Sequence, residues 1–294
     1  MTPATAALLV TSTLAAPGAT LTYDVRQGTD PSLRPLMLIG SPMGAGGFVS
    51  LASHFPERTI ITYDPRGVER SIKDDPTSQS TPEQHAEDIH RVIEAVGLGP
   101  VDLFASSGGA INALALVAAH PEDVVTLVAH EPPLAARVPD REAALATCRA
   151  VARTYQERGF GAGMAHFIAV VAHEGPFTPE FAAQPGPDPQ MFGMPAEDDG
   201  TRTDPLLAQN MVTSTHYEPD IDALRAASTT VVIAVGEASG TQLARRGGEA
   251  VAERLGREPV IFPSDHGGFL GGEYGQMGDP DAFAARLREV LAGA

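Results

Sequence analysis

The chain has 294 residues, of which 43% are apolar and 19% charged, so it is long and apolar enough to bury one large core. Its 37 acidic residues outnumber its 20 basic residues and give a net charge of −17. This excess argues against a nucleic-acid partner, which needs a clustered basic face, and against docking on anionic lipid.

The N-terminal segment and the cysteine content bear on the compartment. Residues 6–10 are the longest apolar run near the start and are too short for the hydrophobic region of a signal peptide. No stretch approaches the ~18 consecutive apolar residues of a membrane span. The single cysteine, Cys148, can form no intrachain disulfide. We therefore expect a cytoplasmic protein without a membrane partner.

The first third of the chain alternates short apolar runs with turns. Two of the runs flank Pro17-Gly18 and predict a hairpin, and another stops at Gly40 as a buried strand does. Strands are expected at residues 11–15, 20–26, 36–39 and 59–63, with a short helix at residues 48–55.

The segment from Thr81 to Gln84 has the composition of a helix start. Thr81 fits the N-cap, Pro82 the first helical position, and Gln84 the closing residue of a capping box. Apolar residues at helical spacing follow as far as Gly97, where we expect the helix to end. A strand at residues 101–104, a buried helix at 110–119 and a strand at 124–129 come next.

From residue 133 to residue 227 the alternation of strands and helices is interrupted. This stretch predicts two helices and a loop rich in Pro, Gly and Asp, but no strand. The helices are expected at residues 140–158 and 161–171 and the loop at 184–200. The alternation then returns, with strands at 230–235 and 259–262 and helices at 241–255 and 281–291.

Strands that alternate with helices imply right-handed crossovers and a mostly parallel sheet. We therefore predict an α/β fold with a mostly parallel sheet of about eight strands flanked by helices. Residues 1–132 and 228–294 form this core, and residues 133–227 form a helical cap. A cap inserted between two strands would lie over the C-terminal edge of the sheet, where such sheets bind ligands.

The turn Ala-Ser-Ser-Gly-Gly at residues 105–109 joins a strand to a helix. A nucleophile on such a turn needs small residues two positions before and after it, because larger side chains clash as the backbone doubles back. Ser107 meets this condition, whereas the residue two positions before Ser106 is Phe104. We therefore predict that Ser107 is a nucleophile and that the Gly108 N–H faces a developing oxyanion.

With this turn the sequence resembles the α/β-hydrolase family, and the resemblance runs along nearly the whole chain. Four stretches carry it, in the order the family has them. They are Ile39-Gly40-Ser41-Pro42 for a His-Gly-x-Pro turn, Asp64-Pro65-Arg66-Gly67-Val68-Glu69-Arg70-Ser71 for Asp-x-Arg-Gly-x-Gly-x-Ser, Ala105-Ser106-Ser107-Gly108-Gly109-Ala110 for the Gly-x-Ser-x-Gly-Gly elbow, and His120-Pro121-Glu122 for the His-Pro-Glu that often follows the elbow helix. The resemblance implies the α/β-hydrolase fold and catalysis through an acyl-enzyme. It also implies a second oxyanion donor, the backbone N–H of Ser41.

A general base is expected in the loop after the last strand. In that loop His266 follows the apolar run that ends at Phe262. A histidine suits this role because its pKa lies near neutrality, so it can accept the serine proton and return it. We predict that His266 is the base.

Three carboxylates are candidates for the acid that orients the base. The resemblance places an Asp three residues after Gly236, but Ser239 stands there. Glu131 ends a strand, a place where some relatives, including certain haloalkane dehalogenases, carry their acid. Glu237 comes two residues before the expected position, and Asp265 adjoins the histidine, where a side chain rarely orients its neighbour's ring. We favour Glu131 and keep Glu237 and Asp265 as alternatives.

Patterns for cofactors and metals are incomplete in this sequence. Gly44 and Gly46 begin a dinucleotide-binding pattern, but Val49 stands where its third glycine belongs, and no Gly-Lys pair forms a phosphate loop. Neither His-Glu pair has a second histidine at the spacing of a zinc protease. We expect no cofactor and no metal.

Apolar side chains are the candidates for the substrate pocket and indicate a medium-sized, fairly apolar ester. They are Met43, Phe167, Met191, Phe192, Met211 and Tyr217. The favoured interpretation is a serine hydrolase that cleaves a carboxylic ester through Ser107. A lactonase, a thioesterase, a cofactor-free perhydrolase and a non-catalytic binding protein on the same fold are the alternatives. The sequence leaves the natural substrate and the oligomeric state open.

Overall fold

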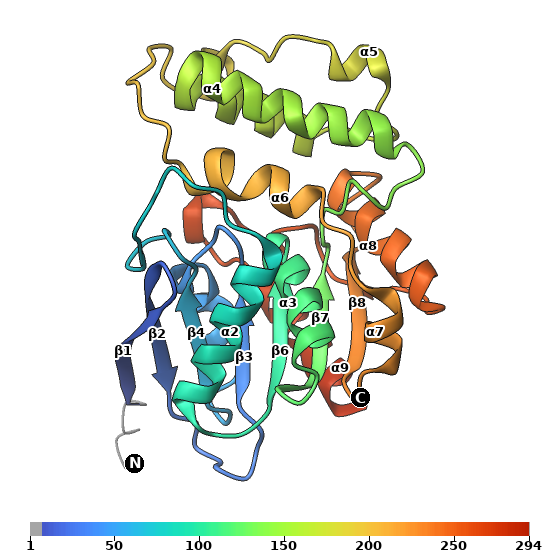
Figure 1. Ribbon diagram of the computed structural model, residues 1–294. Helices are drawn as coiled ribbons and strands as arrows, with labels where there is room; N and C mark the ends of the chain where they lie inside the picture. The colour runs from blue at the N-terminus through green and yellow to red at the C-terminus, as the bar shows by residue number, and fades with distance from the viewer. Residues whose placement is uncertain (1–7, 294) are drawn as a thin grey trace.

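The computed structural model describes residues 8–293, which form one sheet of nine strands with helices on both faces (Figure 1). Residues 1–7, which include part of the N-terminal apolar run, and residue 294 lie outside the described residues. The strands are β1 (Leu9–Ala16), β2 (Ala19–Arg26), β3 (Leu36–Ile39), β4 (Ile60–Asp64), β5 (Ile72–Lys73), β6 (Val101–Ser106), β7 (Val124–His130), β8 (Thr230–Gly236) and β9 (Val260–Phe262).

The sheet is mostly parallel. Its order is β1-β2-β4-β3-β6-β7-β8-β9, and every pair from β4 to β9 is parallel. The β1–β2 hairpin and the short strand β5 are antiparallel additions next to β4 and β2. The predicted mostly parallel sheet is thus confirmed, and β5 is the strand that the sequence did not predict.

Helices cover the two faces of the sheet. They are α1 (Val49–Ser53), α2 (Pro82–Val96), α3 (Gly108–Ala119), α4 (Arg141–Val171), α5 (Pro179–Ala182), α6 (Met211–Thr215), α7 (Ile221–Ala226), α8 (Leu243–Leu255) and α9 (Pro280–Gly293). Shorter turns are the 3-10 helices η1 (Ala45–Phe48), η2 (Pro189–Phe192) and η4 (Glu273–Gly275) and the π-helix η3 (Pro205–Asn210).

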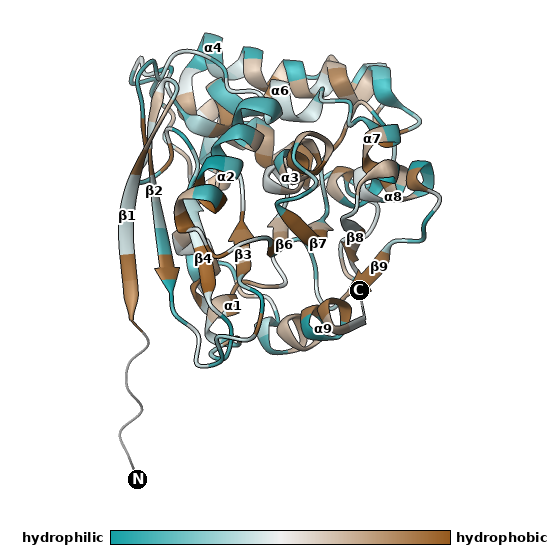
Figure 2. Ribbon diagram, turned by 60° about the horizontal axis from the view of Figure 1, so that its bottom comes forward, coloured by the Kyte–Doolittle hydropathy of each residue, from teal (hydrophilic) through white to brown (hydrophobic). Residues whose placement is uncertain are grey.

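Two apolar clusters fix these helices to the sheet. On one face α2, α3, α7 and α8 pack against the strands, and on the other face α1 and α9 do so. Figure 2 shows the two layers on opposite sides of the sheet, with the central strands mainly in the brown of hydrophobic residues. All residues of β3 and β6 are buried, which the apolar run at residues 36–39 predicted for β3.

The start and end of α2 follow the predicted signals. The Thr81 hydroxyl accepts a hydrogen bond from the Gln84 N–H, and the Gln84 side chain accepts one from the Thr81 N–H. The helix ends at Gly97, whose φ of 66° lies in the left-handed region that favours glycine.

The segment between β7 and β8 forms a helical layer above the C-terminal ends of the strands (Figure 1). Its helices enclose an apolar cluster of their own, which includes Tyr155 and Leu207. The two helices predicted at residues 140–158 and 161–171 are the two parts of α4, which are separated by the non-helical backbone of Gly159, with a φ of 81° and a ψ of −174°. A Cβ at Gly159 would clash with Asp198, so glycine allows the nearby loop to approach the helix closely.

Within residues 8–293, none of the helices combines the length and the apolar character that a membrane crossing requires.

Candidate active site

Ser107 lies in the sharp turn between β6 and α3, at the C-terminal edge of the sheet. Its φ of 58° and ψ of −126° are values that a residue other than glycine rarely adopts. Its N–H donates a hydrogen bond of 2.9 Å to the carbonyl oxygen of His130, at the end of the neighbouring strand β7. Strained backbone of this kind persists where the surrounding structure holds it, and it is concentrated at functional sites.

Close packing explains the glycines after Ser107. A Cβ at Gly109 would lie 2.7 Å from the Gly40 Cα, and one at Gly108 would lie 2.6 Å from the Ser41 carbonyl oxygen. The turn after β6 therefore rests directly on the loop after β3. This contact brings together the two backbone segments that carry the predicted oxyanion donors.

The predicted oxyanion donors have no acceptor within the part of the chain that the structure describes. Neither the Ser41 N–H nor the Gly108 N–H forms a hydrogen bond with an acceptor among residues 8–293. Gly108 is the first residue of α3, where backbone N–H groups have no partner within the helix and carry partial positive charge. Both groups can therefore donate to a negatively charged oxygen.

Asp64 holds the loop after β3 in place. This carboxylate is fully buried, and it accepts hydrogen bonds from the Ala45 N–H at 2.8 Å and from Arg70 Nε at 2.6 Å. It belongs to the Asp-Pro-Arg-Gly stretch that the sequence singled out. The stretch thus connects β4 with the loop that carries Ser41.

Glu131 and His266 are hydrogen-bonded to each other. The distance from His266 Nδ1 to Glu131 Oε2 is 2.7 Å, and the other carboxylate oxygen accepts the Gly236 N–H at 2.8 Å. Burial alone would raise the pKa of Glu131. The hydrogen bond with His266 and the neighbouring imidazoles lower it by a larger amount, so that the pKa is about 2. The ionised carboxylate accepts a hydrogen bond from the Nδ1–H group of His266. In the neutral imidazole this leaves Nε2 without a hydrogen and able to take a proton.

The other two acid candidates form no hydrogen bond or ion pair with His266 among the described residues. The Glu237 side chain is exposed and forms no hydrogen bond or ion pair within the described part of the chain. The exposed Asp265 accepts from the Gly267 N–H at 2.9 Å and so caps its own loop. Ser239, at the position where the resemblance would place an Asp, is fully buried.

The predicted nucleophile, Ser107, and the predicted base, His266, are not hydrogen-bonded to each other among the residues that this structure describes. Catalytic contacts of this kind are often long in free enzymes and tighten in the complex with substrate. The His266 side chain is 38% exposed, which leaves it room to adjust.

His130 is a buried neighbour that sequence reasoning did not select. Neither of its ring nitrogens has a hydrogen-bond partner among the described residues, and burial lowers its pKa to about 4. The ligand atoms of His130, Glu131 and His266 lie within 4.8 Å of one another, so these three side chains have the donor types of a metal site. The His130 ring is instead surrounded by aromatic rings, namely Phe104, Phe262, Phe269 and Phe283.

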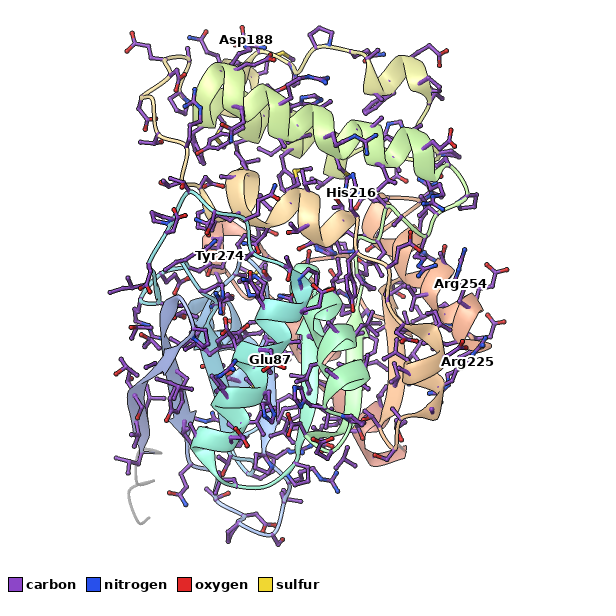
Figure 3. All side chains as sticks on the ribbon, in the orientation of Figure 1. Glu87, Asp188, His216, Arg225, Arg254 and Tyr274 are labelled. Carbon is purple, nitrogen blue, oxygen red and sulfur yellow. The ribbon has the colours of Figure 1, made fainter. Side chains whose placement is uncertain are left out.

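Tyr274 and Glu69 form a second contact that the sequence did not reveal. The Tyr274 hydroxyl donates to Glu69 Oε1 at 2.9 Å, and the Tyr274 ring lies beside Gly47. Glu69 stands where the Asp-x-Arg-Gly-x-Gly-x-Ser pattern has its second glycine. Figure 3 shows Tyr274 between the strand ends and the helical layer.

Backbone strain is concentrated around this edge of the sheet. Five residues other than glycine have a positive φ in the described chain, and all belong to the segments discussed here. They are Glu69, Ser107, Glu131, Ser264 and Tyr274. This grouping is the one expected for a functional site and not for random irregularities.

The six predicted pocket residues are scattered. Met211 is buried in the cluster of the helical layer with Phe167 packed against it, and Tyr217 packs against the main core. Met191 is 77% exposed, Phe192 is half-buried, and Met43 packs near the loop after β3. A surface hollow of about 610 Å³ lies elsewhere, beside α7 and α8, and none of the six lines it.

Comparison with known proteins bears on the fold. A family model described as the alpha/beta hydrolase fold matches residues 36–169. The uncharacterized hydrolase YraK of Bacillus subtilis (strain 168) is 36% identical over 121 residues, which are 41% of this chain and 44% of that protein. The match thus spans less than half the length of this curated relative.

Solved structures of similar shape cover nearly the whole chain. A thermophilic esterase from Thermogutta terrifontis has a TM-score of 0.65 at 22% identity, covering 98% of this chain and 99% of the esterase. A proline iminopeptidase from Mycobacterium smegmatis has a TM-score of 0.64 at 19% identity, covering 97% and 98%. At such identities the likeness concerns the fold. The family model matched over residues 36–169, the strand order and these structural likenesses together show that this chain has the α/β-hydrolase fold.

Proposed function

We propose that this protein is a serine hydrolase that cleaves a carboxylic ester or a similar acyl bond through an acyl-enzyme on Ser107. The observation that carries the proposal is the 2.7 Å hydrogen bond between His266 Nδ1 and the buried Glu131 carboxylate, next to the strained turn of Ser107. The serine, the carboxylate and the histidine follow β6, β7 and β9 at the C-terminal edge of one sheet. This is the set of groups that acyl transfer requires.

In the first half of the proposed reaction, the Ser107 Oγ attacks the carbonyl carbon of the ester. Its proton passes to His266 Nε2, and the buried Glu131 carboxylate stabilises the imidazolium through Nδ1. The Ser41 and Gly108 N–H groups hold the negative charge on the former carbonyl oxygen. The intermediate then expels the alcohol, which takes its proton from His266, and leaves Ser107 acylated.

In the second half, water attacks the acyl group. His266 removes a proton from this water, the same N–H groups hold the new oxyanion, and the carboxylic acid leaves as the proton returns to Ser107. No group beyond the chain and water takes part in these steps.

We further propose that residues 133–227 act as the cap of this site and supply part of its substrate pocket. Their position above the C-terminal strand ends supports this role (Figure 1). Because the apolar candidates are scattered, the pocket wall is expected to include the Met43 loop and Tyr274 as well as cap residues.

The test is hydrolysis of short- and medium-chain p-nitrophenyl esters by the purified protein and four variants. We expect Ser107→Ala to fall to background and Ser106→Ala, the adjacent serine in β6, to keep its activity. Glu131→Gln should lose up to about 10⁴ in kcat, as such triads do when their acid is neutralised. Glu237→Gln, which removes a carboxylate from the same region, should behave like the wild type.

A fluorophosphonate probe gives a second, substrate-independent measurement, because it labels an activated serine and not merely a pocket. We expect labelling of the wild type and of Ser106→Ala, but not of Ser107→Ala. A wild-type protein that is inert towards the esters and also resists this probe would reject the hydrolase proposal in favour of a binding protein on this fold.

A further inference from the structure

Two histidines are stacked on each other at the end of α3 that lies farthest from Ser107. His90 belongs to α2 and His120 follows the last residue of α3. Their ring centroids are 3.9 Å apart and their planes differ by 7°. The length of α3 places this pair about 18 Å from the elbow at 1.5 Å per residue. The pair is thus separate from the site described above.

Carboxylates face all four nitrogens of the two rings. His90 Nδ1 lies 2.7 Å from Asp123, and His120 Nε2 lies 2.8 Å from Glu87, which Figure 3 labels on α2. The remaining nitrogens face Glu94 from His90 at 3.4 Å and Glu122 from His120 at 3.8 Å.

The carboxylates of this cluster carry more negative charge than the neighbouring basic groups neutralise. Two neutral imidazoles carry only two N–H groups for four facing carboxylates. Protonating both rings would stack two cations face to face. Arg91, at 3.4 Å from Glu87, is the one basic side chain paired with these carboxylates in the described structure. One divalent cation would neutralise the carboxylates without placing two imidazolium ions in contact.

We propose that His90, His120 and Asp123 form a binding site for a divalent transition metal ion of the zinc type. Their ligand atoms lie within 4.8 Å of one another, and both histidine side chains are about one-fifth exposed, so an ion can reach them from solvent. Two imidazoles and a carboxylate favour Zn²⁺, Ni²⁺ or Cu²⁺ over Mg²⁺ or Ca²⁺. Glu87 is within reach as a fourth ligand.

Binding requires a small rearrangement of the two rings. Tetrahedral ligands at the usual zinc distances lie about 3.4 Å apart. Ligand atoms of the cluster that now lie as much as 4.8 Å apart must therefore approach each other, and His90 Nδ1 and Asp123, now 2.7 Å apart, must separate slightly. Imidazole lone pairs lie in the ring plane, and parallel rings cannot both aim at one ion. The metal therefore opens the stack, which needs only side-chain rotation at a half-buried surface.

The expected effect of the ion is stabilisation. Asp123 lies between α3 and β7, so an ion held by the three residues ties the middle of α2 to the start of β7. A ligand that binds the native state alone raises the free energy of unfolding. Since the cluster is remote from Ser107, ester hydrolysis should not depend on it.

The experiment is Zn²⁺ titration of the EDTA-treated full-length protein by calorimetry, with the thermal midpoint measured in parallel. We expect one Zn²⁺ per chain at micromolar affinity, a higher midpoint with Zn²⁺ and no response to Mg²⁺. The double variant His90→Gln/His120→Gln should lose both effects, whereas His173→Gln, a histidine of the helical layer, should keep them.

Two results would overturn the proposal. One is a wild-type protein that binds no Zn²⁺ under these conditions. The other is a double variant that still binds Zn²⁺ together with a Glu131→Gln variant that does not. That pattern would place the ion at the group formed by His130, Glu131 and His266. The visible absorption of added Co²⁺ is a further measurement on the wild type, because four-coordinate nitrogen and oxygen ligation changes the intensity of this absorption. It needs no variant, so it remains informative even if a variant fails to fold.

Discussion

At the scale of single residues, Glu131 carries the strongest electrostatic constraint in the candidate site. It has no exposed surface, yet its pKa is lowered to about 2, because the hydrogen bond with His266 and nearby imidazoles outweigh the cost of burial. The hydrogen bond from the Gly236 N–H occupies its second oxygen. A buried carboxylate in this state makes folding depend on pH.

The sign of that dependence follows from the two pKa values. The pKa of Glu131 falls from 4.5 when unfolded to about 2 when folded. Its contribution to the free energy of unfolding is therefore complete above pH 4.5 and is lost as the pH falls towards 2. We expect the stability difference between wild type and Glu131→Gln to shrink by roughly 2 kcal/mol between pH 6 and pH 3. Urea unfolding at pH 6, 5, 4 and 3 measures it, with Glu237→Gln as the exposed control. A difference that stays constant with pH would contradict the lowered pKa.

The local sequence predicted some residues of the candidate site and missed others. Ser107 has its signal in its own neighbours, because the turn needs small residues. The hydrogen bond between Tyr274 and Glu69 joins residues 205 positions apart, and no pattern within either segment encodes it. The scatter of Met191 and Met211 has the same cause, since hydrophobicity alone does not say which cluster a side chain enters.

At the scale of elements, a buried ion pair joins β4 and α2. Arg66, just after β4, donates to both oxygens of Asp88 in α2, at 2.7 Å each. The Asp88 side chain is fully buried and that of Arg66 is 5% exposed. A bidentate pair of this kind fixes the geometry of the two side chains, but it contributes little net free energy to folding. Removing only one partner is costly, because it leaves the other charge buried without compensation.

We predict a large asymmetry between the single and double variants of this pair. Arg66→Met leaves the Asp88 carboxylate buried without a partner and should reduce the free energy of unfolding by about 3–5 kcal/mol. Arg66→Met/Asp88→Leu removes both charges and should be more stable than Arg66→Met. Urea unfolding at neutral pH gives both values. A double variant that is less stable than the single variant would show that the pair itself stabilises the fold.

Elements differ in how far the sequence determines them. The helix α2 has its start and end signals within its own residues, and the structure follows both. The sequence predicted two helices at residues 140–158 and 161–171, and α4 is indeed divided in two by the non-helical backbone of Gly159. The close approach of Asp198 to Gly159 comes from a distant loop, and no pattern in the helix itself predicts it. The two-residue strand β5 exists only through its pairing with β2, and no run of two residues predicts that.

At the scale of the whole molecule, the pattern of buried strands and helices is retained more widely than the sequence. The similar esterase and iminopeptidase structures cover at least 97% of this chain at no more than 22% identity. By contrast, the 36% identical relative matches over 121 residues. Many sequences satisfy the same alternation of strands and helices, which is why the fold was predictable and the substrate was not.

The net charge of −17 acts on every substrate that approaches, whatever the pocket contains. An anionic ester meets repulsion that extends about 30 Å at 0.01 M salt and only about 10 Å at 0.1 M. If Ser107 hydrolyses p-nitrophenyl esters, we expect kcat/KM for a p-nitrophenyl ester with a free carboxylate to rise several-fold between these salt concentrations. A neutral p-nitrophenyl ester of equal chain length should not change, and it is the control because the leaving group is the same. An anionic ester that becomes a poorer substrate as salt is added would mean that a local positive group, and not the overall charge, governs its approach to the site.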